Sequence, residues 1–180
     1  PSTIADVACT IKQASPVPCD VVRMVSAPLN EKPSERYYIN VADVGVGGQV
    51  VNIVNNTSKF LGGALSFFLA GLQATLFQYK NAPLHLELDG RTICTSARHY
   101  FVAVANGRYF GGGMHIAPDA CLDDGLLDIV LVGDLTLPGK VYFASKLYRG
   151  KAGELRKVQI LRGRRLSIRS PHSVFIEADG

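Results

Sequence analysis

Alternating apolar and polar positions mark strands in the second half of the chain. Leucines at positions 84, 86 and 88 would point to one side of a strand, with His85 and Glu87 on the other side. Asp89 and Gly90 follow, and both residue types tolerate the positive φ angles of a two-residue hairpin turn. The pattern therefore predicts a hairpin whose return strand starts at Arg91. Further strands are expected at residues 17–25, 36–44, 100–105, 126–132, 158–161, 166–169 and 174–178.

Helical spacing appears in fewer places. The clearest case is a long helix over residues 56–80, because Leu61, Leu65, Phe68 and Leu72 recur on one face. A short helix is expected over residues 4–12, and a second, basic helix over residues 145–155. Strands dominate and turn signals recur at short intervals, which predicts a mainly β (α+β) fold. We expect an antiparallel β-sandwich with one or two packed helices.

Composition agrees with one globular domain. A chain of 180 residues suits a single domain, and 47% hydrophobic residues can form a sizeable core. No stretch of 18 apolar residues lacks polar breaks, so a membrane span is not expected. The N-terminal residues do not have the pattern of a signal peptide. These features favour a cytoplasmic protein.

The four cysteines do not form a metal-binding pattern. Cys9, Cys19, Cys94 and Cys121 include no CxxC pair, and no histidine follows at the spacing of a zinc site. Reduced, mostly buried thiols are the favoured interpretation. A disulfide framework or a zinc site is the alternative.

Positive charge is concentrated near the C-terminal end. Residues 140–169 contain ten Lys or Arg and one acid, Glu154, which leaves a net charge of −5 on the rest of a chain of net +4. A basic face can meet anionic lipid headgroups, phosphorylated ligands or nucleic acid. Solvated strand edges are the alternative without function. Nucleic acid is disfavoured, because no aromatic residues interleave with the arginines.

The segment most informative about chemistry is residues 106–128, NGRYFGGGMHIAPDACLDDGLLD. Its three consecutive glycines could cradle a phosphate, but no helix is expected after them, as a phosphate loop requires. Four aspartates, at positions 119, 123, 124 and 128, could hold a hard cation such as Mg²⁺ or Ca²⁺. An acidic turn with Asp124 and Gly125 at its corner is the alternative.

This segment, continued to residue 132, resembles the signature of the superfamily of diacylglycerol kinases, sphingosine kinases and bacterial YegS-like lipid kinases. About 25 residues match in order. Asn40 to Gly45 is similar to the family's Asn-x-x-x-x-Gly element, although Val46, Gly47 and Gly48 stand where the family often has aromatic-Asp-Ala. Residues 175–180 resemble the strand that leads into the family's Asp-Gly-Glu motif. The relation spans nearly all 180 residues.

The resemblance implies the C-terminal, lipid-binding domain of such a kinase, without the N-terminal domain that grips ATP through a Gly-Gly-Asp-Gly-Thr loop. The whole enzyme would transfer the γ-phosphate of ATP to a lipid hydroxyl, and this chain alone would be inactive. Asp179 would be the catalytic residue that takes the hydroxyl proton. A structural Mg²⁺ would bind the Asp124 side chain and the backbone carbonyls of Cys121 and Leu126, and ATP would be the other cofactor.

The lipid would lie in an apolar cleft whose expected walls are residues 60–77 and the strand at residues 100–104, and the basic stretch could contact an anionic membrane surface. Two alternatives stay open. One is a binding module with a kinase-like fold that holds lipid or protein without catalysis. The other is a domain related to nicotinamide-nucleotide (NAD) kinases. The lipid itself and the oligomeric state do not follow from the sequence.

Overall fold

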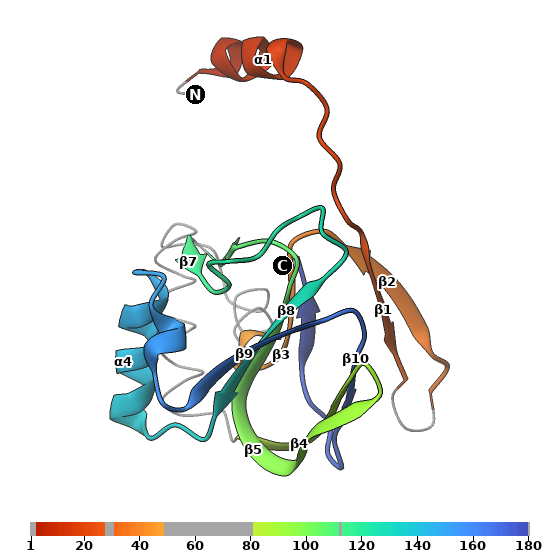
Figure 1. The fold of residues 1–180 in the computed structure, drawn as a ribbon, viewed down its shortest axis with the longest axis vertical. Coiled ribbons are helices and arrows are strands. Elements are labelled where there is room, and N and C mark those ends of the chain that lie inside the picture. The colour runs from red at the N-terminus through yellow and green to blue at the C-terminus, as the bar shows by residue number, and fades with distance from the viewer. Residues whose placement is uncertain (1–2, 28–30, 49–80, 112, 180) are drawn as a thin grey trace, which may run out of the picture.

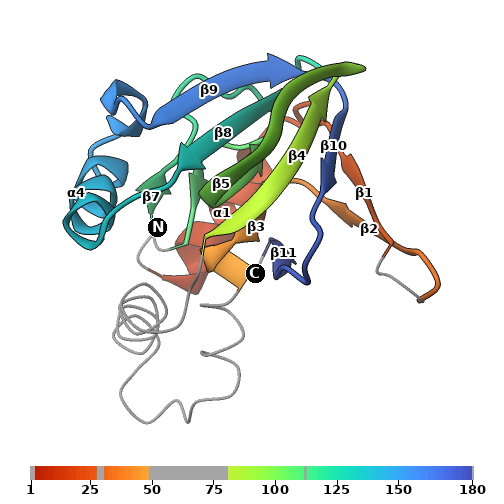
Figure 2. The same ribbon diagram turned by 90° about the horizontal axis from the view of Figure 1, so that it is seen from below.

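The computed structural model describes residues 3–27, 31–48, 81–111 and 113–179. Within these ranges the chain consists mostly of antiparallel strands with few helices, which confirms the expected fold class (Figures 1 and 2). The helix expected over residues 56–80 lies outside the described residues. No helix among the described residues is long and apolar enough to cross a membrane.

Seven strands form one antiparallel sheet around the long strand β5 (Arg91–Ala105). The sheet order is β10 (Leu166–Arg169), β4 (Ala82–Leu88), β5, β3 (Val41–Gly45) and β11 (Ile176–Ala178). A further strand, β8 (Leu127–Gly133), pairs with both β5 and β9 (Val158–Gly163). These strands agree with the predicted ones to within a few residues.

Strand β5 is continuous where two strands were expected. Its first part pairs with β4, and its last five residues pair with β3 and β8. The change of partner comes with a register shift against β8 between His99 and Phe101, and with a positive φ of 54° at Ser96. The expected hairpin turn is confirmed, with φ angles of 49° at Asp89 and 79° at Gly90.

The sheet is curved (Figure 2), and an apolar cluster lies on each of its faces. The first cluster joins Phe101, Ala103 and Val130 to residues of the helix α4 (Leu137–Leu147) and of the loop around Ile116. The second cluster is built from alternate residues of the same strands, such as Val102 and Ile129, with leucines 84, 86 and 88. Successive residues of these strands point to opposite faces of the sheet, and both sets are buried. The sheet is therefore covered on its two faces.

Helix α4 corrects one prediction. A basic helix was expected over residues 145–155, but the helix occupies Leu137–Leu147 and is followed by a short 3-10 turn, η3 (Ala152–Glu154). Pro138 sits in the first turn, where proline is tolerated, and Gly150 ends the helical region with a φ of 65°. These two local signals agree with the observed bounds and not with the predicted ones.

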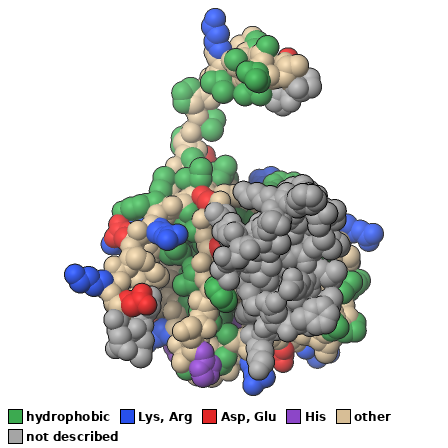
Figure 3. Space-filling view, turned by 180° about the vertical axis from the view of Figure 1, so that it is seen from behind, with side chains coloured by type: hydrophobic (Ala, Val, Ile, Leu, Met, Phe, Trp, Pro, Cys, Tyr) green, Lys and Arg blue, Asp and Glu red, His purple; other side chains and the backbone are tan. Residues whose placement is uncertain are grey.

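The N-terminal part stands apart from the sheet. Helix α1 (Ile4–Gln13) has no buried residue and shows apolar side chains on its surface (Figures 1 and 3). It leads to a separate two-stranded hairpin, β1 (Val22–Ser26) with β2 (Ser34–Tyr38). The strand expected from residue 17 begins only at Val22. Pro18 lies in the missing part, and proline lacks the N–H that a strand ladder uses.

We expect the second apolar cluster to supply a large share of stability. Leu86 is fully buried, so Leu86→Ala should lower the free energy of unfolding by about 2–5 kcal/mol. Val141→Ala is the matched control, because Val141 is exposed on α4. Urea unfolding of both variants measures the difference. Equal, small losses in the two variants would contradict the packing described here.

Candidate functional site

Asp179 binds the turn between β2 and β3, which we call the 39–41 turn. Its carboxylate accepts three backbone N–H groups: Oδ2 from Ile39 at 2.9 Å, and Oδ1 from Asn40 and Val41 at 3.1 Å each. The Asp179 N–H donates in return to the Val41 carbonyl at 3.1 Å. The residue holds a φ of 57°, a conformation that aspartate tolerates better than most side chains. Asp179 is thereby fixed at the edge of the sheet.

This contact explains why one predicted strand is wrong. Residues 36–44 alternate like a single strand, yet the structure breaks them at Ile39 and Asn40 into β2 and β3. The N–H groups at the break are satisfied by a carboxylate from the far end of the chain, instead of by a neighbouring strand. Because the strand breaks here, the N–H groups of three consecutive residues all point toward the Asp179 carboxylate.

Two asparagines tie the 39–41 turn to the segment that follows β5. The buried Asn106 side chain donates to the carbonyls of Ile39 at 2.9 Å and Asp20 at 3.1 Å. The Asn40 side chain donates to the Tyr109 carbonyl at 2.9 Å, and the Asn40 carbonyl accepts the N–H groups of Asn106 and Gly107. A Cβ on Gly107 would overlap the Asn40 side chain. The Asn-Gly pair in the sequence motif is therefore required by this packing.

The glycine-rich stretch forms a tight hairpin between β6 (Tyr109–Phe110) and β7 (Met114–His115). Gly111 and Gly113 take positive φ angles of 44° and 92°. The rings of Tyr109 and His115 stack at 4.3 Å between centroids. These glycines turn the chain between two short strands, and no helix N-terminus follows them, so the stretch lacks the geometry of a phosphate loop.

The acidic turn at residues 121–126 is closed by an arginine. The Arg162 guanidinium binds the Asp124 carboxylate, and its Nε lies 3.5 Å from the buried Asp128 carboxylate. The other Asp124 oxygen accepts the Leu126 N–H at 3.0 Å. Burial raises the pKa of Asp128, and Arg162 opposes that rise. A positive group thus already compensates the acids of this turn.

The predicted magnesium site falls within this acidic turn. Its members Asp124, Cys121 and Leu126 do lie in one turn, and the Cys121 thiol donates to Asp123 at 3.1 Å. Because the Asp124 carboxylate is bound by Arg162, the donors as arranged fit Mg²⁺ only if that guanidinium moves away. The magnesium site stays a prediction.

A pair of carboxyl groups, the buried Asp43 and the half-buried Glu177, lies close in the sheet to Asp179. Asp43 on β3 faces Glu177 on β11 across the sheet, and their side chains are hydrogen-bonded. Asp43 is only 1% exposed and also accepts the Gly48 N–H at 3.3 Å. Burial raises the pKa of Asp43 well above its usual range, and the nearby charge of Glu177 adds to the rise. The rise favours the protonated form of Asp43 beside the Glu177 carboxyl group.

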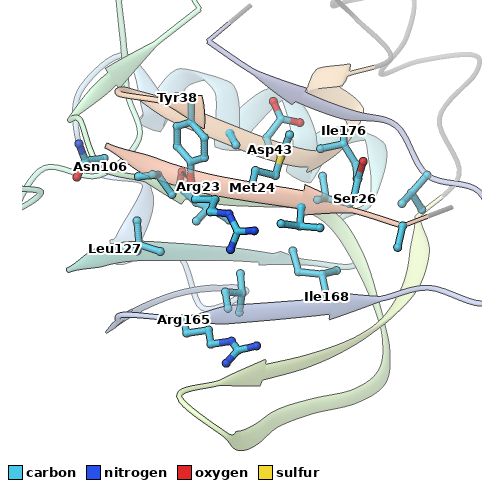
Figure 4. A pocket seen from close by; sticks show the side chains of 18 of the residues that line it. Arg23, Met24, Ser26, Tyr38, Asp43, Asn106, Leu127, Arg165, Ile168 and Ile176 are labelled. Carbon is cyan, nitrogen blue, oxygen red and sulfur yellow. Dashed lines mark hydrogen bonds between the residues drawn. The ribbon is translucent and has the colours of Figure 1, made fainter. Parts of the chain in front are cut away.

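A cavity of about 830 Å³ lies between the β1–β2 hairpin and the curved sheet (Figure 4). Apolar side chains from β1, β3, β8, β10 and β11 dominate its lining, among them Met24, Val44, Leu127, Ile168 and Ile176. An apolar cavity of this size can hold part of a lipid chain.

One end of the cavity reaches Tyr38, the residue before the 39–41 turn. The Tyr38 hydroxyl donates to the Val104 carbonyl at 3.1 Å. Burial is the main cause that raises the pKa of Tyr38, and the negative charge of Asp179 raises it further. The apolar space therefore ends close to the Asp179 carboxylate.

The expected cleft walls are corrected in part. Val104 lines the cavity as expected, but Tyr100 packs in the first apolar cluster against Phe143 of α4, at 6.3 Å between ring centroids. Residues 60–77, the other expected wall, lie outside the described residues. The hairpin β1–β2 is a wall that sequence reasoning missed.

Comparison with known proteins gives the family. A family model described as the YegS C-terminal NAD kinase beta sandwich-like domain matches residues 40–180. The chain belongs to this family. The match includes the 39–41 turn from Asn40 onward, the hairpin after Asn106, and Asp179.

Curated relatives of this YegS-type domain carry lipid kinase names. One, "Probable lipid kinase YegS-like" of Xanthomonas oryzae pv. oryzae (strain MAFF 311018), is 26% identical over 89% of this chain and 49% of its own length. "Diacylglycerol kinase" of Staphylococcus aureus (strain bovine RF122 / ET3-1) is 27% identical over 83% of this chain and 46% of its own. The chain spans about half the length of these relatives.

A solved structure shares the fold. A putative diacylglycerol kinase from Bacillus anthracis str. Sterne superposes with a TM-score of 0.72 at 21% identity, covering 100% of this chain and 55% of that one. The sequence motif had pointed to this superfamily, and the family match confirms it. The carboxyl pair Asp43–Glu177 and the ion pairs of Arg162 carried no motif and were missed.

We expect Asp43→Asn to stabilise the domain, and more so at high pH. Because the folded pKa of Asp43 is raised above the unfolded value of about 4, the folded state holds an extra proton, and its stability falls as pH rises above that value. Asparagine needs no such proton and can donate to Glu177. Thermal midpoints at pH 5 and pH 8 should show the larger gain at pH 8. Asp119→Asn, at an exposed acid, should show no such trend.

We expect Arg162→Gln to lower the free energy of unfolding by about 1–3 kcal/mol in metal-free buffer, because Asp124 and the buried Asp128 lose their compensating charge. Added Mg²⁺ should restore part of this loss, since it can then reach the acidic turn. The unchanged chain should respond less to Mg²⁺. Urea unfolding with EDTA and with MgCl₂ measures both effects, and an equal response to Mg²⁺ in both proteins would contradict the role of Arg162.

Proposed function

We propose that this chain is the lipid-substrate domain of a diacylglycerol kinase-like enzyme, which transfers the γ-phosphate of ATP to a lipid hydroxyl. The observation that carries the proposal is the apolar cavity that ends at Tyr38, beside the 39–41 turn that holds Asp179. A lipid in this cavity would bring its polar end to a fixed carboxylate. The lipid kinase names of the relatives support the same activity.

The chain covers about half of the relatives' length, so part of the active site would come from sequence outside it. ATP and the Mg²⁺ that accompanies it would be held mainly there, since a phosphate loop is not found among the described residues. The isolated chain is expected to bind lipid without turning over ATP. A cytoplasmic location with access to a membrane surface fits such a substrate.

The Asp179 carboxylate has the geometry of a positioned proton acceptor. A carboxylate offers about four lone-pair sites, and three backbone N–H groups use three of them. The unused site is on Oδ2, which among the described residues accepts a hydrogen bond from Ile39 alone. A substrate hydroxyl there would pass its proton to Oδ2 while its oxygen bonds to the γ-phosphorus and ADP leaves.

The same contacts support a second candidate, a binding module without catalysis. A carboxylate that accepts three backbone hydrogen bonds can have a purely structural role, in which it keeps β11 beside β3. The cavity would then hold a lipid or an apolar segment of a partner without phosphate transfer. A domain related to NAD kinases is a further alternative, and the lipid kinase names of the relatives favour the lipid over a dinucleotide.

The complete protein that carries this chain should be assayed for phosphate transfer from ATP to a panel of lipids with free hydroxyls. We expect Asp179→Asn to lower kcat about 10²–10⁴-fold, because the amide cannot take the proton. Glu31→Gln, at an exposed acid outside the aspartate cluster, is the control and should keep full activity. Thermal midpoints of both variants separate lost chemistry from a loosened turn.

Transfer to one lipid, lost in Asp179→Asn while the fold stays intact, would support the proposal and name the substrate. Activity that survives in a folded Asp179→Asn protein would exclude Asp179 as the proton acceptor. Lipid binding with no transfer to any lipid would favour the binding module.

A further inference from the structure

The turn between β9 and β10 holds Arg164 and Arg165 in a fixed backbone conformation. The Asp89 carboxylate accepts the Arg164 N–H at 3.0 and 3.2 Å and the Arg165 N–H at 2.8 Å, and the Asp89 N–H donates to the Arg165 carbonyl at 2.9 Å. Gly163 packs so closely on Leu88 that a Cβ would clash. We call residues 163–165 the arginine turn.

The two side chains of the arginine turn are exposed and make no ion pair with any described residue. The other basic groups of residues 140–169 are partly used inside the fold. Lys140 is buried over the Tyr100 ring, Lys146 pairs with Glu154, and Arg162 pairs with two aspartates. The basic residues of this stretch therefore do not form one continuous positive face. The two side chains of the arginine turn are among those that remain available to bind a ligand.

The arginine turn lies at the rim of the apolar cavity (Figure 4). Both arginines belong to its lining, and β10 continues from them into the cavity with Leu166 and Ile168. The lining also includes Val21, which precedes β1, and Val25 of β1, which are 61% and 53% exposed. Two positive charges, carried by a turn whose backbone is held in place, therefore lie beside an opening with exposed apolar side chains.

We propose that the arginine turn binds the phosphate groups of anionic phospholipids and places the cavity mouth on a membrane surface. Guanidinium groups bind phosphate oxygens in pairs, and each positive charge near an anionic bilayer adds to the attraction. The exposed valines of β1 would enter the headgroup region beside them. The inference rests on the proposed function, because the cavity is taken to receive its lipid from that surface.

The charge and shape of the site favour this partner over nucleic acid. Among the described lining residues Tyr38 is the one Phe, Tyr or Trp side chain, and it is buried and hydrogen-bonded to Val104; the other aromatic ring is the imidazole of His172. Stacked bases would need such a ring. An apolar opening next to two cations instead matches the two parts of a phospholipid.

The test is co-sedimentation of the complete chain with vesicles, without ATP. One set of vesicles is phosphatidylcholine alone, and the other contains phosphatidylglycerol as well. Arg164→Gln/Arg165→Gln should weaken binding to the anionic vesicles about tenfold to thirtyfold. The matched control is Arg149→Gln/Arg156→Gln, which removes the same charge from exposed arginines outside the cavity lining. The backbone contacts to Asp89 remain in the variant, and thermal midpoints check the fold.

A tryptophan probe reports whether the cavity mouth itself meets the bilayer. The chain contains no tryptophan, so Val25→Trp gives a single signal at the rim. Its emission should shift to the blue with anionic vesicles and stay unchanged with phosphatidylcholine alone. The shift should disappear when the two arginines of the turn are also replaced.

Binding that is lost in the turn variant and kept in the control, with the tryptophan shift, would support the proposal. Equal losses in both variants would show a general charge effect and overturn it, as would equal binding to neutral vesicles or no binding at all. Since no step uses ATP, these outcomes are distinct from a failure of the kinase assay.

Discussion

The bond between Asp179 and the 39–41 turn is the contact on which the arrangement of the site depends. One carboxylate supplies the acceptors for three consecutive N–H groups that would otherwise be unpaired, and its own N–H returns to Val41. The contact keeps the edge strand β11 beside β3, and with it the pairing of Glu177 with Asp43. Asn106 anchors the same turn to the chain after β5, so three distant segments meet there.

Electrostatics inside the domain follow from burial more than from net charge. Arg162 is positioned between two aspartates, and burial together with the nearby Glu177 raises the pKa of Asp43. Lys140 lies over an aromatic ring. A chain with a basic stretch of net +9 thus uses several of its charges to satisfy its own structure. The charge that remains for a ligand is set by the fold and is smaller than the sequence suggests.

Local patterns predicted much of the fold. Asp89 and Gly90 specify their hairpin turn by their own backbone preferences, and the strand over residues 166–169 was predicted to the residue. The break at Ile39 was not predictable in the same way, because its cause is a side chain about 140 residues away. The motif residues Asn40, Asn106 and Asp179 were found by resemblance, and the structure shows them joined. Arg162 and Asp43 have no local signature, since their roles come from partners on other strands.

The distance along the chain between Asp179 and its partners has a consequence for synthesis. A ribosome adds roughly 5–20 residues per second, so about 140 residues separate the two halves of the contact by roughly 7–28 seconds. During that interval the 39–41 segment has its strand-like sequence but not its acceptor. Until Asp179 is synthesised, the N–H groups of residues 39–41 can therefore pair with other acceptors. The part of the cavity near Tyr38 is completed only when β11 has been synthesised, after the other described strands.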